Sequence, residues 1–136
     1  MDQFKHFVEQ EIPFNRFLGL KVDTMGGGGA KLVLPFRPEL VGDARRPALH
    51  GGVISMLIDT CGGVAVWSAC NPEDRIATID LRVDYLRPAP PKDLAAEAEV
   101  KLLGNRVANC HIKVHTLDDP GTIIAEGRGV YNVRKG

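Results

Sequence analysis

The sequence predicts an α+β fold in which an antiparallel β-sheet curls around one long central helix. The run ALHGGVISMLIDTCGGVAVW, residues 48–67, is the most apolar stretch of the chain and is long enough to form a helix. From residue 75 onwards, apolar and polar residues instead alternate with a period of two, which is typical of half-buried strands. Because a helix that is apolar on nearly every side needs cover on nearly every side, we expect the strands to wrap around it.

The region before this helix is expected to contain a shorter helix and a β-hairpin. Apolar residues recur at helical spacing in the first dozen positions: Phe4, Phe7, Val8 and Ile12. This spacing predicts an amphipathic helix that ends near Pro13. Short strands are then expected over residues 18–22 and 30–36, joined by a turn at glycines 26–29. These glycines are not a phosphate-binding loop, since the GK[ST] ending and a following helix are both missing.

Four strands in a meander are expected after the apolar helix. The first, RIATIDLRVDY at residues 75–85, alternates so that five apolar side chains share one face: Ala77, Ile79, Leu81, Val83 and Tyr85. Thr78 is then expected on the opposite, polar face. Two further strands, at about 94–103 and 106–117, flank the turn residues GN, and the turn DDPG leads into a last strand through Val133.

Composition and charge narrow the class of protein. With 136 residues, the chain is expected to form one domain, residues 1–136, with a single core. The 17 basic and 17 acidic residues balance, which removes the electrostatic argument for nucleic acid or an anionic membrane as a partner. Three cysteines without CxxC spacing suit a reducing compartment, and the N-terminus has no apolar signal segment, so we expect a cytoplasmic protein. A membrane span is not expected, because Asp59 and two glycines interrupt the apolar run.

Metal binding and catalysis by a thiol or hydroxyl nucleophile are not expected. His111 and His115 lie four residues apart near Cys110, but strand alternation puts both histidines on the solvated face and the cysteine on the inner face. The sequence therefore predicts no metal site and no cofactor. Cys61 lies two residues from Asp59, yet an apolar setting makes a thiol unreactive, so we expect a packing residue. No Gly-x-Ser-x-Gly motif is present.

The residue that needs an explanation is Asp59, a single carboxylate inside the apolar run. Burial of an ionised carboxylate without a partner is so costly that this residue must be neutralised, paired or in use. Small or polar residues recur every four positions along its face of the helix: Gly51, Ser55, Asp59 and Gly63. Such a stripe leaves room for a ligand. The alternative is that the glycines only allow close packing and that Asp59 hydrogen-bonds to a neighbouring strand or chain.

The start of the apolar helix is a second chemical feature. His50, Gly51 and Gly52 lead into its first turn, where backbone N–H groups lack partners and the positive end of the helix dipole can stabilise an oxyanion. Gly51 and Asp59 are eight residues apart, which is about 12 Å along a straight helix. Two groups that act on one carbonyl must each approach it within about 3 Å. If both serve one reaction, the helix start of one subunit must face Asp59 of another, which predicts at least a two-fold dimer.

At these residues the sequence resembles a known family. HGGVISMLID, the following Gly62 and Gly63, and the later ATIDLRVDYLRPAP are similar to the hotdog-fold acyl-CoA thioesterases of the phenylacetic-acid-degradation, or PaaI-like, family. The similarity extends from Phe14 to Val133, nearly the whole chain. It implies a hotdog fold, in which an antiparallel sheet wraps around a long helix. It also implies homodimers, and dimers of dimers, that hydrolyse acyl-CoA thioesters at the subunit interface.

The resemblance implies roles for individual residues as well. Asp59 would be the general base or the nucleophile toward the thioester carbonyl, and the Gly51 N–H would polarise that carbonyl. His50 would shape the start of the helix, Gly52 would allow close approach of the substrate, and Thr78 would orient water.

Other features leave the function open. Arg87 and Arg106 are candidates for contacts with the CoA phosphates, although a surface role is an equal alternative for each. Many family members have Asn or Gln six or seven residues before the histidine, where this chain has Ala44 and Asp43. Two rival functions remain: a hotdog acyl-CoA-binding module without turnover, and a hotdog hydratase or dehydratase whose base is the histidine.

Overall fold

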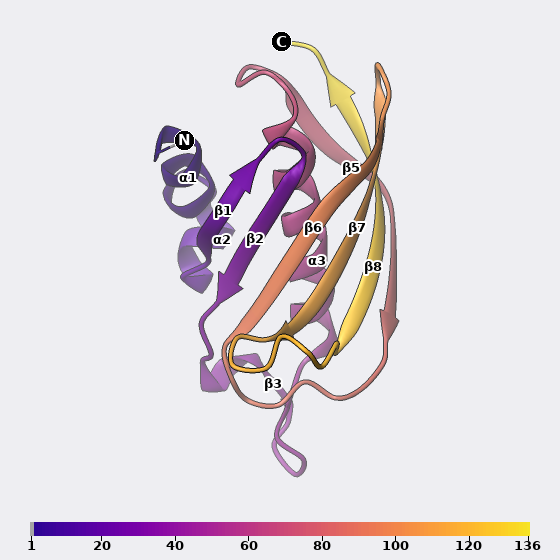
Figure 1. Cartoon of the computed structure of the whole chain (residues 1–136). Helices are drawn as coiled ribbons and strands as arrows, with labels where there is room; N and C mark the ends of the chain where they lie inside the picture. Colours follow the sequence, from indigo (N-terminus) through magenta and orange to yellow (C-terminus); the bar gives the residue numbers. More distant parts are fainter. Residues whose placement is uncertain (1) are drawn as a thin grey trace.

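An antiparallel sheet of six strands wraps around helix α3, Gly51–Ser68, in the computed structural model, which describes residues 2–136 (Figure 1). The strand order is β1-β2-β6-β7-β8-β5. The strands are β1 Lys21–Gly26, β2 Gly29–Leu34, β5 Arg75–Tyr85, β6 Leu94–Leu103, β7 Val107–Thr116 and β8 Ala125–Arg134. This is the expected α+β architecture, and the hotdog arrangement is confirmed.

The N-terminal helical region is longer than the sequence pattern predicts. It consists of α1 Asp2–His6, the π-helical turn η1 Phe7–Glu11 and α2 Pro13–Leu18. The helix was expected to end near Pro13, but this proline instead begins α2. Proline is tolerated in the first turn of a helix, so it can mark the start of one helix as well as the end of another. Gly19, in the left-handed region with φ of 71°, then ends α2. The first strand therefore begins at Lys21, and the expected start at residue 18 is wrong.

The first hairpin forms at the glycine-rich turn, as expected. Gly27 and Gly28 have positive φ angles of 58° and 91°, which a two-residue hairpin turn requires and glycine adopts without strain. The N–H of Gly28 donates to the hydroxyl of Ser68 at 2.9 Å. The turn is therefore anchored to the last residue of α3.

Helix α3 forms the centre of the core. Leu57, Ile58, Cys61 and Ala65 are fully buried beneath the sheet. Close approach of β8 depends on glycine: a Cβ on Gly62 would lie 2.2 Å from the hydroxyl oxygen of Tyr131. The length and mean hydropathy of α3, 1.3 over its 18 residues, would also suit a membrane span. The sheet that packs on it identifies α3 as the core helix of a soluble fold.

Strand β5 does not belong to the expected meander. Only β6, β7 and β8 follow one another as neighbours, whereas β5 pairs with β8 and forms one edge of the sheet. The segment between β5 and β6 crosses the end of the sheet, so that β6 enters between β2 and β7 (Figure 1). The expected loop before α3 contains a 3-10 turn, η2 Pro38–Leu40, and a small hairpin of β3 Val41–Asp43 and β4 Ala48–Leu49.

A β-bulge in β5 changes which side chains face the helix. Thr78 pairs with Tyr131 and Asp80 with Val130, so Ile79 is an extra residue. The Thr78 hydroxyl reaches Asp59 on α3, although strict alternation was expected to turn it to the polar face. Ile79, expected on the inner face, is 57% exposed. The expected facing of this strand is therefore wrong around the bulge, because an inserted residue reverses the alternation.

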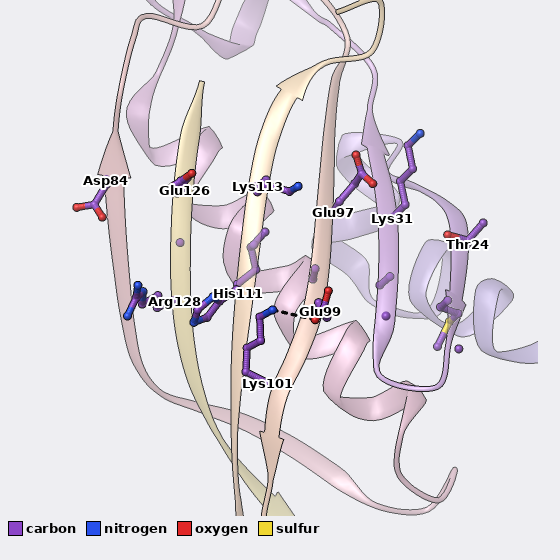
Figure 2. Close-up of a pocket in the computed structure, with 17 residues that line it drawn as sticks. Thr24, Lys31, Asp84, Glu97, Glu99, Lys101, His111, Lys113, Glu126 and Arg128 are labelled. Atoms are coloured by element: carbon purple, nitrogen blue, oxygen red, sulfur yellow. Dashed lines mark hydrogen bonds and ion pairs between the residues drawn. The ribbon is translucent and has the colours of Figure 1, made fainter. Parts of the chain in front are cut away.

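The outer face of the sheet is strongly charged (Figure 2). Cross-strand neighbours alternate in sign along one row, which runs Lys31, Glu97, Lys113 and Glu126. These residues line a shallow cavity of about 750 Å³ on the side of the sheet opposite to α3. Asp59 is not among the residues of this cavity.

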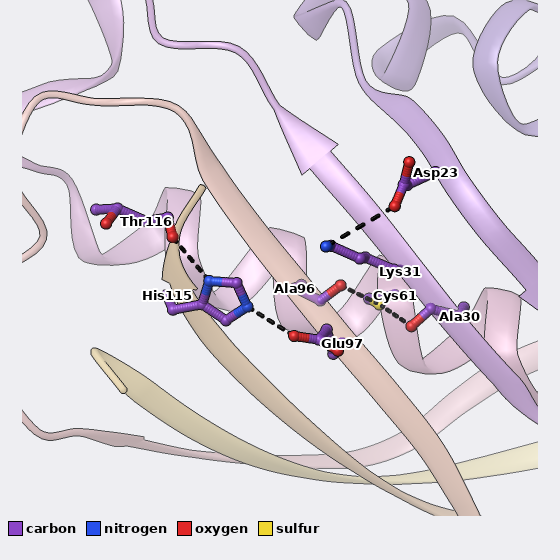
Figure 3. Close-up of polar contacts among 8 residues, drawn as sticks. All are labelled: Asp23, Ala30, Lys31, Cys61, Ala96, Glu97, His115 and Thr116. Atoms are coloured by element: carbon purple, nitrogen blue, oxygen red, sulfur yellow. Dashed lines mark hydrogen bonds and ion pairs between the residues drawn. The ribbon is translucent and has the colours of Figure 1, made fainter. Parts of the chain in front are cut away.

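His115 is buried, which corrects the expectation of a solvated side chain (Figure 3). Its Nδ1–H donates to the carbonyl oxygen of Thr116 at 2.7 Å, and its Nε2 lies 2.7 Å from Oε2 of Glu97. The segments that precede β6 and follow β7 meet at this end of the sheet, where the Leu117 N–H donates to the Asp93 carbonyl. Alternation gives the direction of a side chain, but not whether neighbouring loops enclose it.

Candidate active site

His50 caps the start of α3 through its side chain. Its Nδ1 accepts the N–H of Gly52 at 2.8 Å, and its backbone N–H donates to the Leu40 carbonyl at 2.8 Å. The Val53 N–H is also satisfied, by the His50 carbonyl. Among residues 2–136, the Gly51 N–H has no acceptor. The first turn of α3 therefore presents one free N–H at the positive end of the helix dipole.

Tyr85 is a site residue that the sequence reasoning missed. It ends β5, and its hydroxyl donates to the Gly51 carbonyl at 2.9 Å and shares a short hydrogen bond with the Ser55 hydroxyl. Its ring lies directly beside Gly51, where an added Cβ would be 3.5 Å from Cε1. The sequence did contain a sign of this role, because Tyr85 carries a hydroxyl group and was expected on the face of the strand that points toward the helix. Tyr85 holds the first turn of α3 in place.

Asp59 is half-buried, and its carboxylate has a hydroxyl partner rather than a cation. The Thr78 Oγ1–H donates to Oδ1 of Asp59 at 2.7 Å. In the described part of the chain, no lysine, arginine or histidine forms an ion pair with Asp59. The Tyr131 hydroxyl donates to its backbone carbonyl at 3.0 Å and fixes this turn of α3. One carboxylate oxygen is thus held by Thr78 and the other is available to a substrate or water.

Asp59 and Thr78 line a cavity of about 760 Å³ between α3, β5 and the N-terminal helical region. Three of its lining residues form an aromatic cluster: the Phe4 and Trp67 rings meet edge to face at 4.9 Å between centroids, and Phe7 packs on Trp67 at 5.4 Å. A carboxylate at one side of an apolar cavity can act on the polar head of a molecule whose tail is apolar.

The two chemical features do not meet within one chain. Helix α3 is continuous from Gly51 to Ser68, so Gly51 and Asp59 lie about 12 Å apart along its axis. The Gly51 N–H and the Asp59 carboxylate therefore cannot act on one carbonyl of the same subunit. Thr78 lies on β5, and in the described chain β5 pairs on one side alone, with β8.

The two arginines proposed for CoA adjoin opposite ends of β5. The Arg87 guanidinium donates to the Ile123 carbonyl just beyond the end of β5, whereas the Arg106 carbonyl accepts the Val133 N–H near its beginning. β5 has 11 residues, so these ends are about 35 Å apart. One chain alone does not bring both arginines to one ligand.

The positions before His50 where the family often has Asn or Gln are engaged elsewhere or exposed. Asp43 accepts from the Arg45 guanidinium at 3.1 Å, and this hydrogen bond holds the pKa of Asp43 below its usual range. Ala44 is exposed and carries no polar group. Neither residue supplies a catalytic amide.

The thiols of Cys61 and Cys110 are buried inside the fold. Cys61 lies between the Ala30 and Ala96 carbonyls (Figure 3), and burial raises the pKa of its thiol far above the usual value. Burial also raises the pKa of Cys110 to about 11. In the described residues, no group of three or more His, Cys, Asp and Glu side chains is placed to hold a metal.

Comparison with known proteins gives a consistent result. Residues 47–123 match the thioesterase superfamily. The medium/long-chain acyl-CoA thioesterase YigI of Salmonella typhimurium is 34% identical over 135 residues, 90% of this chain and 86% of YigI. A protein of Halobacterium salinarum is 40% identical over 124 residues, 86% of this chain and 82% of the relative. A crystal structure from Shewanella oneidensis, described as related to the thioesterase superfamily, is 31% identical with a TM-score of 0.84, covering 96% of this chain and 93% of that chain.

Proposed function

The chain belongs to the thioesterase superfamily and is a thioesterase, and from this premise we propose that it hydrolyses acyl-CoA to a free acid and CoA. The observation that carries the proposal is the Asp59 carboxylate, which has Thr78 as its side-chain partner and lines an apolar cavity. The apolar cavity suits an acyl chain. The similarity to YigI, named for medium- and long-chain acyl-CoA, supports the same class of substrate.

In the proposed reaction, Asp59 acts as the general base or the nucleophile toward the thioester carbonyl. As a base, it removes a proton from the water that adds to the carbonyl carbon; the carbon–sulfur bond then breaks, and Asp59 returns this proton to the sulfur so that CoA leaves as the thiol. Thr78, which donates to Oδ1, fixes the carboxylate so that Oδ2 points to the reacting atoms. The negative charge that develops on the carbonyl oxygen is stabilised by the Gly51 N–H, and Gly52 lets the substrate approach closely.

The two groups meet if the chains pair about a two-fold axis. We propose that the axis lies beside the outer edge of β5, so that the α3 N-terminus of one subunit faces Asp59 of the other. Such pairing also turns the Arg87 end of one chain toward the Arg106 end of its partner, where the two could contact CoA phosphates. The functional unit is then a homodimer or a dimer of dimers, formed by residues 1–136 as one domain in the cytoplasm.

Two rival functions predict different behaviour. A binding module without turnover has no need of Asp59, and the similarity to named thioesterases favours catalysis. A hydratase or dehydratase would use His50 as its base. In this structure, however, Nδ1 of His50 already accepts the Gly52 N–H as the helix cap, which suits a structural role better.

The test is a hydrolysis screen with acyl-CoA substrates that range from butanoyl to dodecanoyl and include phenylacetyl-CoA. Release of free CoA is followed with a thiol reagent. We expect hydrolysis that is saturable in acyl-CoA. Tight acyl-CoA binding without thiol release would support the binding module, and hydration of an enoyl thioester without release would support the hydratase.

A further inference from the structure

We propose that Gly63 and the aromatic cluster of Phe4, Phe7 and Trp67 set the length of the acyl group that the site accepts. Gly63 keeps the cavity open between Asp59 and the cluster, and the cluster closes its far end. The proposal rests on the proposed function, because it assigns the cavity beside Asp59 to the acyl chain.

The spacing along α3 gives the cavity its direction. Asp59, Gly63 and Trp67 follow one another at intervals of four, so they lie on one face of the helix, and all three line the same cavity. From Asp59 to Trp67 the helix rises about 12 Å. An acyl group with its carbonyl at Asp59 can therefore extend past Gly63 to the Trp67 ring.

Gly63 differs from its neighbour Gly62 in what surrounds it. A Cβ on Gly62 would collide with the Tyr131 hydroxyl at 2.2 Å, so packing requires glycine there. A Cβ on Gly63 would meet only Tyr131 Cε1 at 3.7 Å, an ordinary contact. Gly63 has no positive φ either, and glycine inside a helix is less stable than alanine. Neither packing nor backbone conformation explains Gly63, whereas an open cavity does.

The end wall is built by segments far apart in the sequence. Phe4 of α1 and Phe7 of η1 both pack against Trp67, at 4.9 Å and 5.4 Å between ring centroids. Phe7 is partly exposed, at 41%, so its removal opens the wall without emptying the core. Phe14 on α2 is a matched control, because it is also exposed and does not line the cavity.

The first test replaces Gly63 and measures the ratio of kcat/KM for dodecanoyl-CoA to kcat/KM for butanoyl-CoA. A leucine side chain at this position projects into the passage. In Gly63→Leu the ratio is expected to fall about tenfold or more, on the scale of discrimination by apolar pockets, and Gly63→Ala should show a smaller fall. A ratio unchanged in folded Gly63→Leu, or an equal loss for both substrates, overturns the proposal.

The second test decides the question even if Gly63→Leu fails to fold. Phe7→Ala should raise the same ratio severalfold, whereas Phe14→Ala should leave it at the wild-type value. Equal ratios in Phe7→Ala and wild type overturn the assignment of the end wall. Wild-type protein that hydrolyses no acyl-CoA contradicts the proposed function itself, whereas active protein with unaltered chain-length preference contradicts only this inference.

Discussion

One inserted residue gives Asp59 its partner. The bulge at Ile79 brings the Thr78 hydroxyl to the carboxylate at 2.7 Å, while Tyr85 further along the same strand still reaches Gly51. In a regular strand, residues seven apart point to opposite faces, so both contacts could not form. The sequence pattern singled out Asp59, and the resemblance to the family added Thr78. The period of two nevertheless placed Thr78 on the wrong face, because the alternation of apolar and polar residues does not reveal a bulge.

Replacement of the Asp59 carboxylate by an amide is expected to abolish most of the activity and leave the fold intact. In Asp59→Asn the Thr78 hydroxyl can still donate to the side-chain oxygen, so the hydrogen bond survives while the base is lost. We expect kcat to fall by about 10² or more, the scale of general-base loss. Steady-state hydrolysis with circular dichroism as the folding control measures this; near-normal turnover would remove Asp59 from the mechanism.

Glu97 is expected to make stability depend on pH in the acid range. The hydrogen bond from His115 lowers the pKa of Glu97 below its ordinary value of 4.5. A carboxyl with a lowered folded-state pKa stabilises the fold above its unfolded value, and this contribution is lost as pH falls through the folded value. Urea unfolding from neutral pH to below 4.5 should show a smaller acid loss in Glu97→Gln than in wild type. Parallel pH profiles would show that the pair is not coupled to folding.

At the scale of elements, the sequence predicted the kinds of elements and the pairing of consecutive strands in β1-β2 and β6-β7-β8, but not the pairing of β5. The apolar run gave α3, and alternation gave β5 with its observed bounds, because both patterns are local. The place of β5 beside β8 could not be predicted in the same way, since strand order depends on contacts across the whole chain. Pro13 shows a local ambiguity: proline ends one helix and begins the next.

The cap of α3 should contribute measurably to stability. His50→Ala removes the Nδ1 acceptor of the Gly52 N–H, and loss of a helix cap typically costs about 1 kcal/mol. His50→Asn supplies a side-chain oxygen that can accept the same N–H, so it should recover most of that stability. Chemical denaturation of the three proteins at neutral pH compares them. Equal losses in both variants would show that the histidine stabilises the fold by other contacts.

At the scale of the whole molecule, the proposed site is incomplete in one chain. α3 separates the free Gly51 N–H from the Asp59 carboxylate by about 12 Å, and both features were identified from the sequence. If both groups serve one reaction, the helix length implies that a second chain is needed, and the structure adds β5 as a strand at the sheet edge beside Thr78. The central claim is therefore that each active site combines two subunits.

Mixed dimers of two inactive variants test this claim most directly. Asp59→Asn removes the carboxylate, and Gly51→Pro removes the N–H at the first helical position, where proline is tolerated because His50 is already extended, with ψ of 136°. In a mixed dimer, one site combines the intact Asp59 of one chain with the intact Gly51 of the other, and the second site carries both defects. Random exchange makes about half of the dimers mixed, so the mixture should recover roughly a quarter of wild-type activity.

Each variant alone should show almost no hydrolysis, and mass spectrometry should confirm that subunits have exchanged. Recovery of about a quarter of the wild-type rate after exchange is the result that the shared site predicts. If exchange is complete and the mixture is no more active than the separate variants, Gly51 and Asp59 do not meet across a subunit interface, and the proposed mechanism is wrong.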